Sequence, residues 1–361
     1  MRFLWVASIA VLLASSVSNV SGVAQATSAA ASVPALPKEP AEIFAAAAPL
    51  YDFSSPSLKP WHMKVSYQLY DEKGGPTDKG SYEYWWATPD TYRSTWLRPG
   101  VELTDWHVAG KAFHVGRGES LDFFERKLQS DLLTPLPDVK DLDAEKVRLE
   151  RHDEKFGSTK LPCVMVIHKT PYHAGQLDTV PMGMFPTYCF EPEHPMLRAF
   201  YAFGATQVIY NKVIQVQGMF LARELTILEG QRTVLTATVD LIQGLNAKAA
   251  ALVPAKEAVA LDGLPKIELG SGVAAGNLLK KVPPHYPDDA KQAHVEGTVK
   301  LRALIGMDGH IHDLSVEEGP SPSLIGSAMW AVSQWVYKPY LLNGTPVEVE
   351  TEIKVIYRLG S

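Results

Sequence analysis

The chain has few of the features that mark a nucleic-acid-binding protein, a membrane protein or an enzyme. Its 361 residues carry 34 Lys and Arg against 40 Asp and Glu, a net charge of −6, so no basic field exists to hold nucleic acid or an anionic membrane. The apolar run from Phe3 to Ala14 is about twelve residues long, short of the roughly twenty that span a bilayer. No catalytic triad, phosphate-binding loop or metal motif occurs. We therefore expect a binding protein without a cofactor, and not an enzyme.

Cysteine is also scarce, with only Cys163 and Cys189 in the chain. In an exported protein an even count favours a disulfide, and two strands joined by a loop of about 25 residues can be neighbours. The alternative is two buried thiols on separate strands. His168, His173 and His194 lie near these cysteines, but without the spacing of a zinc motif or the context of a nucleophile, so a metal or catalytic site there is disfavoured.

The N-terminus predicts export. Met1 and Arg2 precede the apolar run, and Ala24-Gln25-Ala26 has the small-x-small form of a signal-peptidase site. We expect residues 1–26 to be a cleaved signal peptide, with an uncleaved membrane anchor as the alternative. No cysteine follows the run, which argues against a lipoprotein anchor. Residues 27–48, rich in Ala, Ser and Pro, are expected to form a disordered leader.

Residues 49–246 predict a strand-rich domain. Segments such as His62 to Tyr70 alternate, and turn signals such as Gly74-Gly75-Pro76 separate them. Leu121 to Leu133 is the exception, because its apolar residues recur at helical spacing. A long antiparallel meander with one helix suggests a curved sheet or half-barrel. Four tryptophans either line a hydrophobic cavity in it or fill an ordinary core: Trp85, Trp86, Trp96 and Trp106.

Between this domain and the C-terminus, residues 247–275 shift to Ala, Lys, Leu, Pro and Gly and are interpreted as a linker. Within it, Leu264 to Leu269 is compatible with a short strand added to either neighbouring domain.

Residues 276–361 predict a small α+β domain of strand, turn, strand, helix and strand. The last strand, Pro346 to Leu359, alternates apolar residues with Glu and Lys, which indicates one buried face. Ser321 before Pro322 is a good N-cap for a helix that we expect to continue to Lys338-Pro339. Asp308-Gly309 predicts a hairpin turn, and the neighbouring His310-x-His312 is interpreted as its solvated end.

This C-terminal region resembles the C-terminal domain of TonB-type energy transducers. The resemblance rests on motifs in the family's order and spacing, among them Glu296-Gly297-Thr298-Val299, Asn343-Gly344-Thr345-Pro346-Val347, and the residues that we take as structural: Tyr286, Pro287, Gly297, Gly309, Trp335 and Pro339. It implies a periplasmic domain that docks on the N-terminal segment of an outer-membrane TonB-dependent transporter by strand addition. The docking edge is then the last strand, through Glu350, Thr351, Glu352, Ile353, Lys354, Val355, Ile356 and Tyr357.

Two further points bear on partners. TonB transducers that work with the inner-membrane motor have a membrane helix bearing a histidine. Residues 3–23 contain no histidine, so it stays open whether this protein has motor-complex partners. The strand end and turn from Trp86 to Arg93 are similar to a turn of the LolA-type lipoprotein-carrier fold. This weaker resemblance supports an alternative function, a periplasmic carrier of lipid or lipoprotein.

Overall fold

The computed structural model describes residues 34–359 except 119–120, 146, 169–184, 203–205, 262–266, 270–275 and 343–344. The expected signal peptide, the first part of the expected leader and His173 lie outside the described residues. No helix in the described part of the chain is long and apolar enough to cross a membrane.

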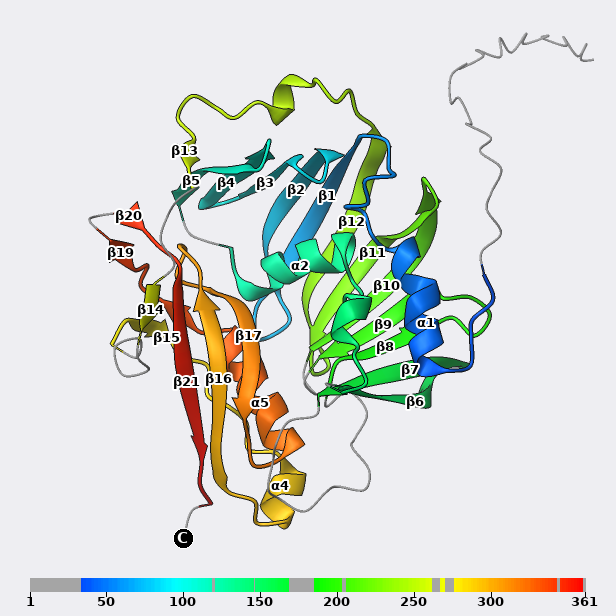
Figure 1. The fold of residues 1–361 in the computed structure, drawn as a ribbon, viewed down its shortest axis with the longest axis vertical. Helices are drawn as coiled ribbons and strands as arrows, with labels where there is room; N and C mark the ends of the chain where they lie inside the picture. Colours follow the sequence, from blue (N-terminus) through cyan, green and yellow to red (C-terminus); the bar gives the residue numbers. More distant parts are fainter. Residues whose placement is uncertain are drawn as a thin grey trace, which may run out of the picture. The chain divides into compact units, whose positions relative to one another are not determined.

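Within the described residues, thirteen strands form one antiparallel sheet that curves strongly (Figure 1). Its order is β13-β5-β4-β3-β2-β1-β12-β11-β10-β9-β8-β7-β6. The predicted curved antiparallel sheet is confirmed. Its strands are β1 (Trp61–Tyr70), β2 (Pro76–Thr88), β3 (Thr91–Arg98), β4 (Val101–Val108), β5 (Lys111–Gly118), β6 (Val147–Phe156), β7 (Thr159–His168), β8 (Thr187–Phe190), β9 (Leu197–Ala202), β10 (Thr206–Val216), β11 (Met219–Glu229), β12 (Arg232–Gly244) and β13 (Val259–Ala260).

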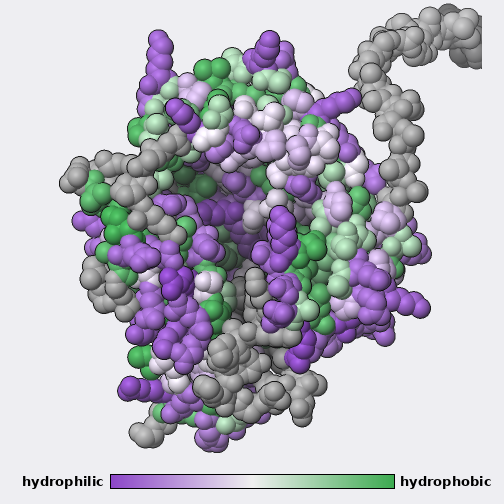
Figure 2. Space-filling view, viewed as in Figure 1, coloured by the Kyte–Doolittle hydropathy of each residue, from purple (hydrophilic) through white to green (hydrophobic). Residues whose placement is uncertain are grey.

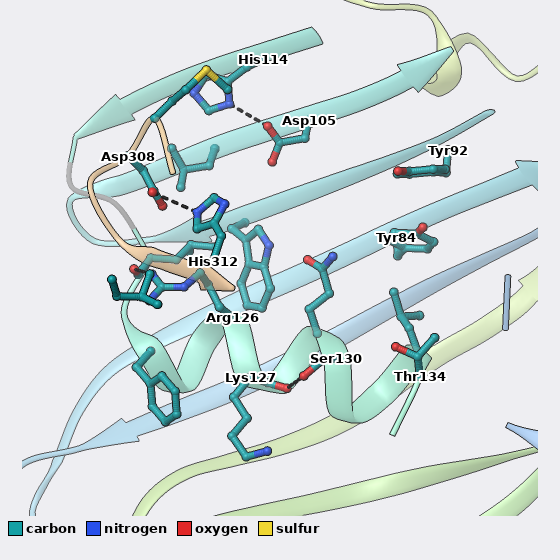
Figure 3. A pocket seen from close by; sticks show the side chains of 18 of the residues that line it. Tyr84, Tyr92, Asp105, His114, Arg126, Lys127, Ser130, Thr134, Asp308 and His312 are labelled. Carbon is teal, nitrogen blue, oxygen red and sulfur yellow. Dashed lines mark hydrogen bonds and ion pairs between the residues drawn. The ribbon is translucent and has the colours of Figure 1, made fainter. Parts of the chain in front are cut away.

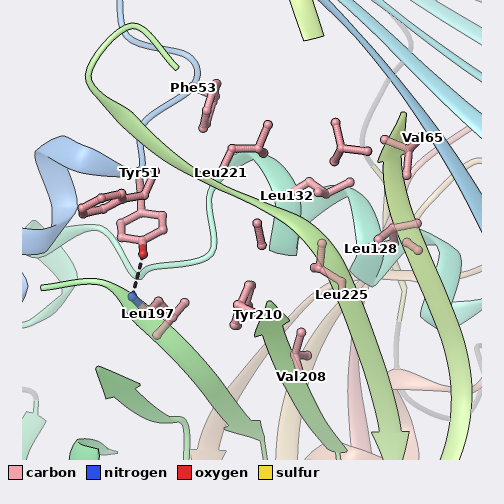
Figure 4. Close-up of a cluster of buried hydrophobic side chains, with 14 of the residues drawn as sticks. Tyr51, Phe53, Val65, Leu128, Leu132, Leu197, Val208, Tyr210, Leu221 and Leu225 are labelled. Carbon is pink, nitrogen blue, oxygen red and sulfur yellow. Dashed lines mark hydrogen bonds between the residues drawn. The ribbon is translucent and has the colours of Figure 1, made fainter. Parts of the chain in front are cut away.

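The predicted helix is α2 (Phe123–Leu133), which packs on the sheet through Leu128 and Leu132, as Figure 4 shows. Its N-cap Asp122 and the N3 residue Glu125 form a reciprocal capping box. Glu125 is fully buried, and its carboxylate accepts hydrogen bonds from Tyr67 Oη at 2.6 Å and Arg98 Nε at 2.8 Å. Because a buried charge needs such partners, this network fixes α2 on one face of the sheet. A short 3₁₀ turn follows at Val139–Asp141.

The expected disordered leader is wrong for its last residues. Pro40–Ala47 form helix α1, followed by a 3₁₀ turn at Ala48–Leu50. Ile43, Phe44 and Ala47 have no exposed surface, and the Phe44 ring meets that of Tyr188 edge-on at 5.3 Å. The segment is Ala-rich, but its larger apolar residues fall on one helical face and are buried in the core of the large sheet.

The described part of the expected linker is anchored at several points. Ala250–Leu252 form a 3₁₀ turn, and the carbonyl of Ala251 accepts hydrogen bonds from Trp106 Nε1 at 3.1 Å and Arg93 Nη1 at 3.4 Å. Further along, β13 pairs with β5 of the large sheet, and β14 (Ile267–Leu269) pairs with the C-terminal sheet. The described part of the segment is thus paired with both sheets, while the interpretation as a linker and its boundaries at residues 247 and 275 stay predictions.

The C-terminal sheet has the order β14-β21-β16-β17. Its long strands have one buried face, as the alternation predicted, because every second residue from Val349 to Tyr357 is buried. The helix α5 covers that face. The elements are β15 (Leu278–Lys280), α4 (Asp288–Gln292), β16 (Gly297–Ile305), β17 (Ile311–Glu318), α5 (Pro322–Ser333), β18 (Val336–Tyr337), β19 (Leu341–Leu342), β20 (Thr345–Pro346) and β21 (Val349–Tyr357).

Helix α5 begins as predicted and ends earlier than predicted. The Ser321 side chain accepts a hydrogen bond from the Leu324 N–H, with Pro322 as the first helical residue. The helix stops at Ser333, before the predicted Lys338-Pro339. The next residues form β18, which pairs with β15, and this tertiary pairing competes successfully with the local helical pattern.

Candidate functional site

Strand β21 has one covered edge and one largely open edge. On one side it pairs along its whole length with β16, from Ile305 opposite Val349 to Gly297 opposite Tyr357. On the other side β14 pairs with it in parallel, and only over Val349–Thr351. Among the described residues no strand pairs with Glu352–Tyr357 on that side. We call residues 352–357 the open run.

The structure leaves only part of the expected docking edge open, and docking itself stays a prediction. Glu350 and Thr351, the first two residues of that edge, lie opposite Glu268 and Leu269 of β14. The sequence analysis found Leu264 to Leu269 compatible with a short strand, and within that stretch the described residues Ile267–Leu269 pair here. Residues from Glu352 onward keep an edge available for pairing.

The side chains of the open run alternate strictly. Ile353, Val355 and Tyr357 face the core and are each at most 5% exposed. On the opposite face the carboxylate of Glu352 lies 2.9 Å from Lys354 Nζ, and Ile356 is 59% exposed. An incoming strand would meet free backbone groups beside one charged pair and one exposed apolar side chain.

Two of the residues that the sequence analysis takes as structural, Tyr286 and Trp335, support this edge. The Tyr286 ring meets that of Tyr357 edge-on at 5.3 Å, and its hydroxyl donates to the Val295 carbonyl at 2.6 Å. Trp335 is 6% exposed, and its Nε1 donates to the Val282 carbonyl at 2.9 Å.

The other structural residues sit at turns. Pro287 is the N-cap residue of α4, Gly297 opens β16, and Pro339 is exposed. Gly309 has φ +80°, and a Cβ there would lie 2.0 Å from the Tyr337 carbonyl oxygen. Only glycine fits this turn.

A second feature is a cavity of about 1460 Å³, seen in close-up in Figure 3. The residues that line it come from both the large sheet and the C-terminal part of the chain. In the space-filling view the surface is hollowed, and hydrophilic side chains lie around the hollow (Figure 2). Aromatic side chains of β2 and β3 form one wall, with α2 facing them (Figure 3). The wall residues are Tyr84, Trp86, Tyr92 and Trp96, and those of α2 include Arg126, Lys127 and Ser130.

The four tryptophans divide between the two faces of the sheet. Trp86 and Trp96 line the cavity, although each is only 1% exposed. Trp85 and Trp106 lie against the Arg93 guanidinium, whose Cζ is 4.4 Å and 5.3 Å from the two rings. Trp86 and Trp96 belong to the hydrophobic core and also line the cavity, so both interpretations hold for these two, whereas Trp85 and Trp106 lie on the other face of the sheet.

Polar groups line one end of the cavity. His114 Nδ1 lies 2.6 Å from Asp105 Oδ1, and His312 Nε2 lies 3.0 Å from Asp308 Oδ1. These hydrogen bonds raise the pKa of both imidazoles. Burial lowers the pKa of the nearby Arg126 guanidinium, which donates to the Leu121 carbonyl at 2.6 Å.

Other candidate residues have simpler roles. Cys163 and Cys189 lie opposite each other in β7 and β8 and form a disulfide. His310 is 6% exposed and its backbone bridges to Val336, so the interpretation of a solvated hairpin end is wrong for His310, while His312 is exposed. In the described ranges no group of three or more His, Cys, Asp or Glu side chains is placed to hold a metal ion.

Comparison with known proteins identifies the small domain. Residues 282–359 match the family model described as Gram-negative bacterial TonB protein C-terminal. The C-terminal domain matches the TonB C-terminal family over these residues. It is 30% identical over 80 residues to Protein TonB of Vibrio cholerae serotype O1, an alignment that covers 22% of this chain and 33% of that protein. The chain thus spans about a third of the length of this curated relative.

Solved structures provide more distant likenesses. A LolA superfamily protein from Nitrosomonas europaea is 8% identical, with a TM-score of 0.34 over 58% of this chain and 95% of that one. A DUF1329 family protein from Desulfovibrio piger is 10% identical, with a TM-score of 0.34 over 55% of this chain and 92% of that one. Nothing about ligands follows from likenesses this remote.

Proposed function

We propose that the TonB C-terminal domain binds the N-terminal segment of an outer-membrane TonB-dependent transporter by adding it as a strand to the open run of β21. The observation that carries the proposal is the open run itself, within a domain matched to the TonB family. In strand addition the main-chain hydrogen bonds supply affinity, while neighbouring side chains supply specificity. Here Glu352 and Lys354 stand beside the edge and would select among partner segments. The role proposed is binding, without catalysis.

The proposed compartment is the periplasm, after removal of residues 1–26. The Cys163–Cys189 disulfide supports it, since disulfides persist in oxidising compartments and are rare in the bacterial cytosol. N-terminal sequencing of the mature protein tests this directly. Thr27 as the first residue supports cleavage, and Met1 as the first residue supports the uncleaved inner-membrane anchor.

Site-specific photocrosslinking tests the docking edge. A crosslinking amino acid at Lys354 is expected to capture outer-membrane transporters in cells of the source organism. The matched control is Lys300, which lies directly opposite Lys354 on the central strand β16. Because Lys300 sits one strand further from the edge, it should give much less product. Equal capture from both positions, or none from Lys354, would falsify strand addition at this edge.

A second candidate function is the carriage of a lipid or lipidated protein in the cavity. The observation that favours it is the volume of about 1460 Å³ with an aromatic wall and a polar end. Such a combination suits an amphiphile, because the walls bury its apolar part and the polar groups orient it.

Detergent-free native mass spectrometry of the full chain tests carriage. Co-purified lipid should be present in the parent protein and depleted in Ser130→Trp, which places an indole at the cavity lining. Ser158→Trp, an exposed position in the β6–β7 turn, is the matched control and should retain lipid. Absence of lipid from the parent, or equal lipid in both variants, argues for a cavity without this role.

A further inference from the structure

Strand β14 pairs with the first part of the β21 edge, and the open run is the remaining part of the same edge. Its three residues pair in parallel with Val349–Thr351, and the Ile267 N–H donates to the Glu348 carbonyl at 3.0 Å. Ile267 and Leu269 are half-buried against the hydrophobic core of the C-terminal domain, while Glu268 is exposed. The chain therefore carries its own strand in the position that an added strand would take.

We propose that β14 is an internal competitor, which a partner segment must displace to pair with the whole of β21. The inference rests on the proposed strand addition and adds a step to it. Docking would have two stages, in which the partner first pairs with the open run and then replaces β14 over Val349–Thr351.

Two features make β14 replaceable. It contributes only three residues of pairing, whereas β16 pairs with all nine residues of the same strand. In addition, Glu268 lies directly opposite Glu350. Paired residues of adjacent strands point to the same face of the sheet, so two carboxylates lie side by side, and like charges in that position destabilise a strand pair.

The pairing of β14 with β21 indicates which partner segment would compete best for this edge. It is an extended segment that runs parallel to β21, with apolar residues at the positions of Ile267 and Leu269. Between them a basic residue would replace the Glu268–Glu350 repulsion with attraction, although Arg302 Nη1 already lies 3.0 Å from the Glu350 carboxylate. A neutral residue there would remove the repulsion alone.

A peptide added in trans tests the competition without knowledge of the transporter. The probe is a nine-residue peptide copying residues 264–272 with lysine in place of Glu268. It is titrated into the parent and into the double variant Ile267→Asp/Leu269→Asp, both as full chains, with backbone amide shifts of Glu350 and Glu352 as the readout. We expect the variant to bind at least about tenfold more tightly, because its own strand no longer holds the edge. A peptide with Asp at both apolar positions is the control and should not bind.

Ile267→Pro provides a second test should the double variant fold poorly. It removes the single N–H that bonds to Glu348 and leaves Leu269 in place. Equal affinity of parent and variants for the peptide, or binding by none of them, overturns the competition. Crosslinking from Lys354 reports strand addition separately, so a failed competition and a failed docking function remain distinguishable.

Discussion

The backbone N–H of Ile267 donates to the carbonyl of Glu348 at 3.0 Å, and this bond shows which backbone groups of β21 face its open edge. Successive residues of a strand direct their N–H and C=O groups alternately to its two sides. Counting from Glu348, the groups of Glu350, Glu352, Lys354 and Ile356 face this side. The parallel pairing of Leu269 with Thr351 directs the Glu352 N–H at the Leu269 carbonyl, so the donors of the open edge are those of Lys354 and Ile356. The groups of Ile353 face β16, opposite Leu301.

Proline at an outward-facing and at an inward-facing position should therefore have different effects. Ile356→Pro removes a donor from the open edge, so we expect a folded protein that has lost most of its crosslinking to transporters. Ile353→Pro removes a bond to β16 inside the sheet and should destabilise the domain by about 3 kcal/mol or more. Circular dichroism melts and crosslinking yields from Lys354 distinguish the two. A folded Ile356→Pro protein with unchanged crosslinking would place docking elsewhere.

Trp335 should be far more sensitive to truncation than its neighbour Trp330. Trp335 is 6% exposed and hydrogen-bonded to Val282, so Trp335→Ala should lower the free energy of unfolding by about 3 to 5 kcal/mol. Trp330 is only half-buried on α5, and Trp330→Ala should lower it by less. Chemical denaturation of both variants measures the difference. A loss below about 1 kcal/mol for Trp335→Ala would contradict its place in the core.

Helix α1 should behave as part of the folded core and not as a leader. Phe44 has no exposed surface, so Phe44→Ala should lower the free energy of unfolding by about 3 to 5 kcal/mol. Glu42→Ala, at an exposed position of the same helix, should change it by less than about 0.5 kcal/mol. Matched denaturation curves provide the measurement. Similar small losses in both variants would mean that the helix is dispensable.

The sequence predicted best those elements whose pattern agrees with their burial. In β21 every second residue is apolar and buried, and the capping signals of α5 coincide with the start of the helix. Strands β4, β5, β6 and β9 were not predicted. In β6 the sequence Val-Arg-Leu-Glu-Arg-His-Asp-Glu-Lys-Phe is dominated by charged residues, which suit an edge strand but hide its alternation.

The site was less predictable than the fold, because its residues meet through tertiary pairing. No local signal in Ile267-Glu268-Leu269 indicates that this strand pairs with β21, some 80 residues later in the chain. The cavity likewise combines residues from distant elements, such as His114 of β5 and His312 of β17. One signal was available for α1, since the spacing of Ile43, Phe44 and Ala47 fits a helical face.

Loss of the disulfide should destabilise the large sheet measurably. Cys163 and Cys189 are 26 residues apart, and closing a loop of this length stabilises by roughly 3 kcal/mol in the chain-entropy model. We expect the double variant Cys163→Ala/Cys189→Ala to lose about that much free energy of unfolding. Denaturation of the parent with and without reductant provides a second measure. Identical curves for all of these forms would argue against a structural role.

The pair Asp308–His312 should make stability depend on pH in a defined direction. The hydrogen bond to Asp308 raises the pKa of His312 above its ordinary value of 6.5, in spite of burial. Burial would raise the pKa of Asp308, yet hydrogen bonds from His310 and His312 bring it well below its ordinary 3.8. The His312 contribution is thus complete below pH 6.5 and lost as pH rises through its folded pKa. The Asp308 contribution is complete above pH 3.8 and lost as pH falls through its folded pKa.

Asp308→Asn tests this linkage. The substitution should bring the pKa of His312 down toward 6.5, because the anionic acceptor is gone, while His114 keeps its raised pKa through Asp105. Asp105→Asn is the matched control and should have the reverse effect on the two histidines. NMR titration of the imidazole protons measures both values in each variant. Above pH 6.5 the parent should lose more stability with rising pH than Asp308→Asn does, and a parallel decline in the two proteins would contradict a contribution from this pair.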